Sequence, residues 1–152
     1  HLFKIQCVGL RFFTVYGPWG RPDMATFIFT KNILENKAIQ IFNYGKMKRD
    51  FTYIDDIVQG VLGVLKIKKK FCHKIYNLGN SHPEVLLEFI EVIEKNLNLK
   101  AKKTLLPIQP GDVSETFADI SESKKDFNFS PKTKVSTGIP KFINWYKDYY
   151  KL

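Results

Sequence analysis

The chain has 152 residues, 44% of them hydrophobic, and a formal net charge of +9. This length and composition suit one globular domain with a core and exclude a disordered chain. Two cysteines give neither a disulfide framework nor a metal-ligand spacing, and no stretch approaches the ~20 apolar residues of a membrane helix. We therefore expect a cytoplasmic protein with no metal and no membrane partner.

The basic excess is mainly lysine scattered along the chain, a pattern typical of solvated surface. The one dense run, "KIKKK" at Lys66 to Lys70, follows an apolar helix-like stretch. Cations there meet the negative end of a helix dipole, and a nucleic-acid patch is the alternative. We favour the helix end and expect no nucleic-acid partner.

Apolar patterning predicts strands that alternate with helices along the whole chain. Asp55 and Asp56 stand where an apolar helix begins, so we interpret them as structural residues of a helix start. This alternation favours an α/β domain. The predicted strands are Cys7–Gly17, Ala38–Gly45, Lys74–Asn80 and the short "KKTLLP", and the predicted helices are Ala25–Glu35, the stretch after Asp55, Pro83–Leu97, Ser121–Phe127 and Thr137–Tyr150.

Only three of the 24 basic residues are arginines: Arg11, Arg21 and Arg49. A guanidinium differs from lysine because its planar fork grips a carboxylate or phosphate with two parallel hydrogen bonds. Arg11 falls within a predicted strand, whereas Arg21 and Arg49 fall on loops. We expect the two loop arginines to approach one anionic ligand, such as a diphosphate with a carboxylate. Chance or a buried ion pair remains the alternative, most of all for Arg11.

A second polar group stands in "QPGD", where Gln109 and Asp112 flank a turn. An amide and a carboxylate so placed can bind the hydroxyls of a sugar or ribose. The tetrapeptide by itself is a weak signal, because Pro-Gly-Asp is also an ordinary turn.

Five stretches together resemble the C-terminal half of extended short-chain dehydrogenases/reductases that act on nucleotide sugars, and most closely the UDP-glucuronate 4-epimerases. Related decarboxylases typically carry asparagine-threonine-tyrosine-glycine-proline-arginine-methionine at the first stretch, whereas this chain has Thr14 and the later Arg21. The stretches are "GLRFFTVYGPWGRPDMA", "NYGKMKRDFTYIDDIV", "YNLGN", "LPIQPGDV" and "WYKDYY".

The resemblance implies roles at the reacting end of the substrate. Thr14 and Arg21 would hold the glucuronate carboxylate. Phe12 and Phe13 would lie near the nicotinamide of NAD. The alternative for the two phenylalanines is an ordinary place in the core.

The resemblance also implies roles at the nucleotide end of the substrate. Phe42 would pack on uracil, Arg49 would grip the diphosphate, and Gln109 and Asp112 would line the nucleotide. Phe42 has the same alternative as the other phenylalanines, a place in the core.

The family binds NAD with a glycine-rich turn and transfers protons with a tyrosine-x-x-x-lysine pair, and this sequence has neither in its proper place. Tyr44 and Lys48 fit the spacing, but the stretch reads as loop rather than helix. We expect no catalytic residue in this chain and NAD bound mainly by a missing N-terminal half. Residues 1–20 would then end a Rossmann-type sheet, and residues 21–152 would form mainly the smaller substrate-binding α/β domain, with some return to that sheet.

The expected function is the nucleotide-sugar-binding portion of a UDP-glucuronate 4-epimerase, inactive alone and a possible homodimer at full length. A related nucleotide-sugar dehydratase or decarboxylase is one alternative. A non-catalytic module that binds nucleotide sugars or polyanions is another, favoured by the missing catalytic pair and the +9 charge.

Overall fold

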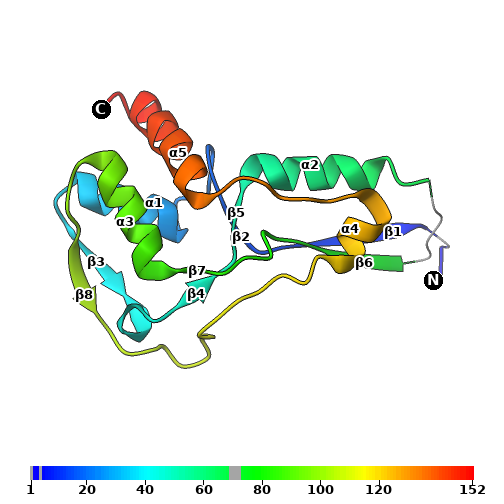
Figure 1. Ribbon diagram of the computed structural model, residues 1–152, viewed down its shortest axis with the longest axis horizontal. Helices are drawn as coiled ribbons and strands as arrows, with labels where there is room; N and C mark the ends of the chain where they lie inside the picture. The colour runs from blue at the N-terminus through cyan, green and yellow to red at the C-terminus, as the bar shows by residue number, and fades with distance from the viewer. Residues whose placement is uncertain (1, 4, 69–72) are drawn as a thin grey trace.

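The computed structural model describes residues 2, 3, 5–68 and 73–152, and its helices and strands alternate as predicted. Figure 1 shows an elongated arrangement, with β1, β6, α2 and α4 toward one end and α1, α3, β3 and β8 toward the other. The elements are β1 Cys7–Phe12, β2 Thr14–Tyr16, α1 Ala25–Leu34, β3 Ala38–Ile41, the 3-10 turn η1 Phe42–Gly45, β4 Lys48–Arg49, β5 Phe51–Tyr53, α2 Ile54–Leu65, β6 His73–Leu78, β7 Glu84–Val85, α3 Leu86–Leu97, β8 Lys102–Leu105, α4 Ser121–Phe127 and α5 Val135–Tyr150.

The predicted single strand Cys7–Gly17 is wrong in one respect, because it divides at Phe13 into β1 and β2. β1 runs parallel to β6, and β2 runs parallel to β5. The change of partner occurs where the N–H of Phe13 donates to the Leu78 carbonyl at 3.2 Å and the N–H of Thr14 donates to the Asp50 carbonyl at 3.2 Å. Residues 7–16 thus connect the two ends of the molecule, and Thr14 is the first residue of the part that pairs with β5.

Two further predicted boundaries differ from the structure. The strand expected to reach Gly45 ends at Ile41, and η1 follows it. The helix expected to begin at Pro83 begins at Leu86, because Glu84 and Val85 pair antiparallel with β4 instead. Pairing between distant segments here outweighs the local preference for helix.

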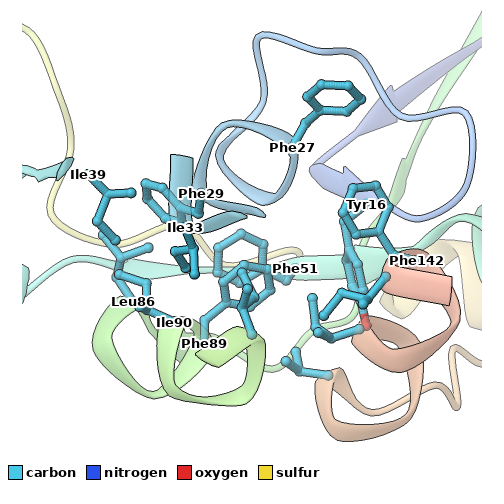
Figure 2. Packing of buried hydrophobic residues seen from close by; sticks show 14 of the residues in the cluster. Tyr16, Phe27, Phe29, Ile33, Ile39, Phe51, Leu86, Phe89, Ile90 and Phe142 are labelled. Carbon is cyan, nitrogen blue, oxygen red and sulfur yellow. The ribbon is translucent and has the colours of Figure 1, made fainter. Parts of the chain in front are cut away.

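The larger hydrophobic core joins β2, β5, α1, α3 and α5 (Figure 2). Phe51 and Phe89 stack at its centre, with ring centroids 3.8 Å apart and planes 12° apart. Tyr16 meets both rings edge-on. Burial of each such side chain stabilises the fold by about 1.5–3 kcal/mol. This packing fixes β2 and β5, whose neighbouring residues form the candidate site.

A smaller cluster of Ile57, Leu78 and Phe129 lies where α2 packs beside β6. α2 ends at Leu65, directly before the lysine run, as expected; Lys69 and Lys70 lie outside the described residues. Asp55 and Asp56 fall in the first turn of α2, which confirms the predicted helix start. Across residues 2, 3, 5–68 and 73–152, no helix combines the length and apolar character needed to cross a membrane.

Candidate functional site

A cavity of about 540 Å³ opens where β2, β4 and η1 converge beside α1. Four of the residues predicted to bind substrate line it: Thr14, Phe42, Arg49 and Asp112. They come from positions up to 98 apart in the sequence, so only the folded chain brings them together. The cavity combines an aromatic side chain, a hydroxyl, a cation and a carboxylate.

Arg49 is held on three sides within this wall. Its Nη2 donates to Oδ1 of Asp112 at 2.9 Å, and its Nη1 donates to the Lys48 carbonyl at 3.0 Å. Its Nη2 also lies 3.9 Å from the sulfur of Met47. Only 17% of the Arg49 side chain is exposed. The guanidinium is therefore pre-positioned at the cavity rather than free in solvent.

Asp50 is not among the predicted site residues, but its side chain connects the segments next to the cavity. It is fully buried, and its carboxylate accepts the backbone N–H groups of Asn80 at 2.6 Å, Ser81 at 2.9 Å and Ala118 at 2.9 Å. A buried carboxylate needs several donors because removal from water is costly. The only sequence signal was an acidic residue directly before an apolar strand.

The segment after β3 places Phe42 in the wall of the cavity. Asn43 and Tyr44 adopt left-handed φ angles of 50° and 51°, which end the strand abruptly. Phe42 is half-buried and belongs to neither hydrophobic cluster. The Phe42 ring is therefore not committed to either hydrophobic cluster.

Arg21 lines a second cavity of about 370 Å³ rather than the first. Met24 lines both, so the two cavities adjoin. The Nε of Arg21 donates to Oδ1 of Asp23 at 3.0 Å, and both side chains are largely exposed. This hydrogen bond holds the pKa of the Asp23 carboxyl below its ordinary value. Thr14 and Arg21, which the resemblance implied would share one carboxylate, thus face adjacent spaces.

Phe12 and Phe13 line the second cavity with Arg21. Phe12 is 51% exposed, and neither ring belongs to a hydrophobic cluster. The core alternative is therefore wrong for Phe12. The pair presents aromatic surface directly beside the space that Thr14 lines.

Gln109 and Arg11 lie outside both cavities. The Gln109 carbonyl accepts the N–H of Asp112 at 3.1 Å, so this residue shapes the turn that carries the carboxylate. Gly111 makes that turn possible with a φ of 83°. Arg11 lies exposed on β1, opposite Asn77.

Tyr44 and Lys48 do not form a helical pair. Tyr44 lies in η1 and Lys48 in β4, whereas the family's proton-transfer pair shares one helix. Over the described ranges, no group of three or more His, Cys, Asp or Glu side chains could hold a metal ion.

A model of the NAD dependent epimerase/dehydratase family matches residues 1–79, half of the chain. The chain belongs to this family. An uncharacterized protein of Methanocaldococcus jannaschii is 56% identical over 146 residues, which cover 96% of this chain and 44% of that protein. UDP-glucuronate 4-epimerase 2 of Arabidopsis thaliana is 45% identical over 166 residues, which cover 99% of this chain and 38% of that enzyme.

Among solved structures, the UDP-glucuronic acid 4-epimerase of Bacillus cereus, in complex with UDP-glucuronic acid and NAD, aligns with a TM-score of 0.91 and 38% identity. The alignment covers 97% of this chain and 47% of that enzyme. The predicted likeness to Rossmann-type epimerases is thereby confirmed. The chain spans about half the length, or less, of the proteins that it matches in this epimerase/dehydratase family.

Proposed function

We propose that this chain is the nucleotide-sugar-binding portion of a UDP-glucuronate 4-epimerase, which interconverts UDP-glucuronate and UDP-galacturonate through a 4-keto sugar. The observation that carries the proposal is the single cavity that Thr14, Phe42, Arg49 and Asp112 line. These side chains match a carboxylated sugar, a base, a diphosphate and a ribose. The 38% identity with the Bacillus cereus enzyme supports the same choice.

The substrate would lie along this cavity with its nucleotide at Phe42 and its diphosphate at Arg49. The Arg49 guanidinium is already oriented, so little side-chain entropy is lost when it meets a phosphate. Asp112 neutralises the cation until then and offers carboxylate oxygens to ribose hydroxyls. Arg49 thus provides affinity for any UDP-sugar.

The acidic sugar would extend toward the junction of the two cavities, where Thr14 and Arg21 lie. A 4-keto glucuronate is a β-keto acid and loses carbon dioxide when its carboxylate aligns with the keto group. A hydroxyl and a guanidinium that hold this carboxylate out of alignment protect the intermediate. Thr14 and Arg21 would therefore serve both specificity and product fidelity.

The second cavity fits the nicotinamide end of NAD, because Phe12 and Phe13 offer flat apolar surface beside the sugar cavity. NAD, when bound, accepts and returns the hydride at C4 of the sugar. This chain's part would be to flank the ring and exclude water with the two phenylalanines. We assign no proton transfer to Tyr44 or Lys48, and we assign the family's catalytic pair and glycine-rich turn to the other half of the enzyme.

We also propose the division of the chain that the sequence suggested. Residues 1–20 would complete a dinucleotide-binding sheet, and residues 21–152 would mainly bind the nucleotide sugar, with β6 returning to that sheet. The parallel pairing of β1 with β6 supports this division, because parallel strands build such sheets.

The experiment is product analysis on the full-length protein that contains this chain, supplied with UDP-glucuronate and NAD. We expect UDP-galacturonate with the carboxylate retained. Release of carbon dioxide as the main reaction would show a decarboxylase, and loss of water a dehydratase. Binding of UDP-glucuronate without turnover would show a binding module. The 152-residue chain assayed alone should give no product, because it lacks the family's proton-transfer helix.

A further inference from the structure

The loop between β2 and α1 carries Arg21 but makes few hydrogen bonds to the rest of the fold. In the described part of the chain, the hydrogen bonds of residues 18–23 all end within segment 17–24. The N–H of Gly20 donates to the Gly17 carbonyl at 3.1 Å, and that of Met24 donates to the Arg21 carbonyl at 3.1 Å. Another kind of interaction must therefore attach the tip of this loop to the fold.

An aromatic contact provides this attachment. The ring of Trp19 lies 5.4 Å from that of Trp145 and 5.3 Å from that of Tyr149, measured between centroids. Trp145 and Tyr149 are four residues apart on α5, so they share one helix face, and they stack with centroids 5.4 Å apart. Such separations are those of attractive aromatic pairs. Trp19 nevertheless stays 75% exposed, so it rests on the helix rather than in the core.

The backbone at Trp19 makes this choice of residue informative. Its φ of 62° lies in the left-handed region, which a bulky side chain seldom adopts. A turn of this shape would be easier with glycine or asparagine. The tryptophan side chain therefore has a use that outweighs the backbone preference, and its contact with α5 supplies one.

The helix on which Trp19 rests, α5, is anchored in the larger hydrophobic core. α5 buries Phe142, Ile143 and Tyr146 in the larger core, and Trp145 packs against that core through the rings of Phe142 and Tyr146. A loop docked on this helix is consequently docked on the core itself. Arg21 follows Trp19 by two residues and lines the cavity that Trp19 also lines.

We infer that Trp19 is a positioning residue for recognition of the acidic sugar: it docks the Arg21 loop on α5 and so holds the guanidinium at the junction of the two cavities. The partner of Arg21 in this structure, Asp23, is largely exposed, and exposed ion pairs fix orientation weakly. The position of Arg21 must then come from its backbone. This inference rests on the proposed function, because it assumes a carboxylated substrate.

The docking itself has a spectroscopic signature. The 152 residues contain two tryptophans, and they are the two that contact each other. Adjacent indoles give an exciton-coupled circular dichroism band. In the full-length protein, Trp19→Phe and Trp145→Phe should each abolish the same band. If the two difference spectra share no coupled band, the loop is not docked and the inference is wrong.

A positioning role also predicts that loss of Trp19 weakens UDP-glucuronate but not UDP. Trp19→Ala should raise the KM for UDP-glucuronate about tenfold and leave the inhibition constant of UDP unchanged. Trp19→Phe should recover most of this loss. Tyr150→Ala is the matched control, because Tyr150 is an exposed aromatic residue of α5 that contacts Phe27, Tyr146 and Tyr149 but not Trp19. It should leave the KM unchanged.

A double-mutant cycle then connects Trp19 with Arg21. Trp19→Ala should add little to the loss caused by Arg21→Lys, because the first acts through the second. Additive losses, or an equal fall in UDP affinity, would contradict the positioning role. A wild-type protein that neither binds nor converts UDP-glucuronate would contradict the proposed function, and with it the specificity role. The coupled band would still decide whether Trp19 docks.

Discussion

The carboxylate of Asp50 accepts the backbone N–H of Ala118, 68 residues further along the chain, at 2.9 Å. The same residue accepts the N–H of Thr14 at its carbonyl and donates its own N–H to the Thr116 hydroxyl. Thr14 and Arg49 line the cavity, and residues 116–118 follow Asp112, which lines it too. One buried residue therefore ties together the segments that form the candidate site.

We predict that Asp50→Asn lowers the free energy of unfolding by about 3 kcal/mol. The amide replaces one acceptor oxygen with a donor that faces buried N–H groups, and unpaired buried groups are costly. Urea denaturation measures the change. Asp119→Asn is the control, because Asp119 is an exposed carboxylate that accepts one N–H, from Ser121. Equal stability of the two variants would contradict the central role of Asp50.

Arg49→Ala should weaken UDP, UDP-glucose and UDP-glucuronate by similar factors, about tenfold or more, because the proposed contact is to their shared diphosphate. Isothermal titration with each ligand measures it. Lys46→Ala removes a nearby exposed charge that does not line the cavity, and it should have little effect. A loss confined to one sugar would move Arg49 away from the phosphates.

Arg21→Lys should weaken UDP-glucuronate roughly ten- to a hundredfold and leave UDP nearly unchanged, because lysine keeps the charge but loses the planar fork. The variant should also release more carbon dioxide per turnover. Thr14→Ala should show both effects more weakly, since it removes a neutral group. If both affinities fall together without decarboxylation, Arg21 does not read the carboxylate.

The lowered pKa of Glu94 predicts how the free energy of unfolding depends on pH. Glu94 is buried, which by itself raises its pKa, but hydrogen bonds from Lys103, the Ala101 N–H and Lys100 outweigh burial and lower the pKa below 4.5. A lowered pKa means stability that is present above pH 4.5 and lost as the pH falls through the folded value. Glu94→Gln should therefore cost about 1–2 kcal/mol at pH 7 and progressively less below pH 4.5. A cost independent of pH would contradict this account.

The hydroxyl of Tyr16 is buried without a hydrogen-bond partner in the described part of the chain, against the first turn of α5. Burial raises the pKa of this phenol, so it stays neutral. Tyr16→Phe should thus be neutral or stabilise the fold by up to about 1 kcal/mol. Gly138→Ala should destabilise it, because a Cβ there would clash with the Tyr16 hydroxyl oxygen. Thermal denaturation of both variants tests the contact, and a clear loss in Tyr16→Phe would reveal a partner.

The sequence alone determined the α/β class, the helix starts at Ala25 and near Asp55 and Asp56, and the family resemblance, because hydrophobic period and long motifs are local properties. That resemblance also indicated Thr14, Phe42, Arg49 and Asp112 as candidate substrate-binding residues. Only the tertiary structure decided the break at Phe13, the late start of α3 and the hub at Asp50. These depend on hydrogen bonds between segments 30 to 68 residues apart, which leave no periodic trace in the chain. The tertiary structure also showed that Arg21 and Gln109 do not line the cavity of Thr14, Phe42, Arg49 and Asp112. The direction of a side chain on a loop depends on the turns of that loop and on its contacts with the rest of the fold.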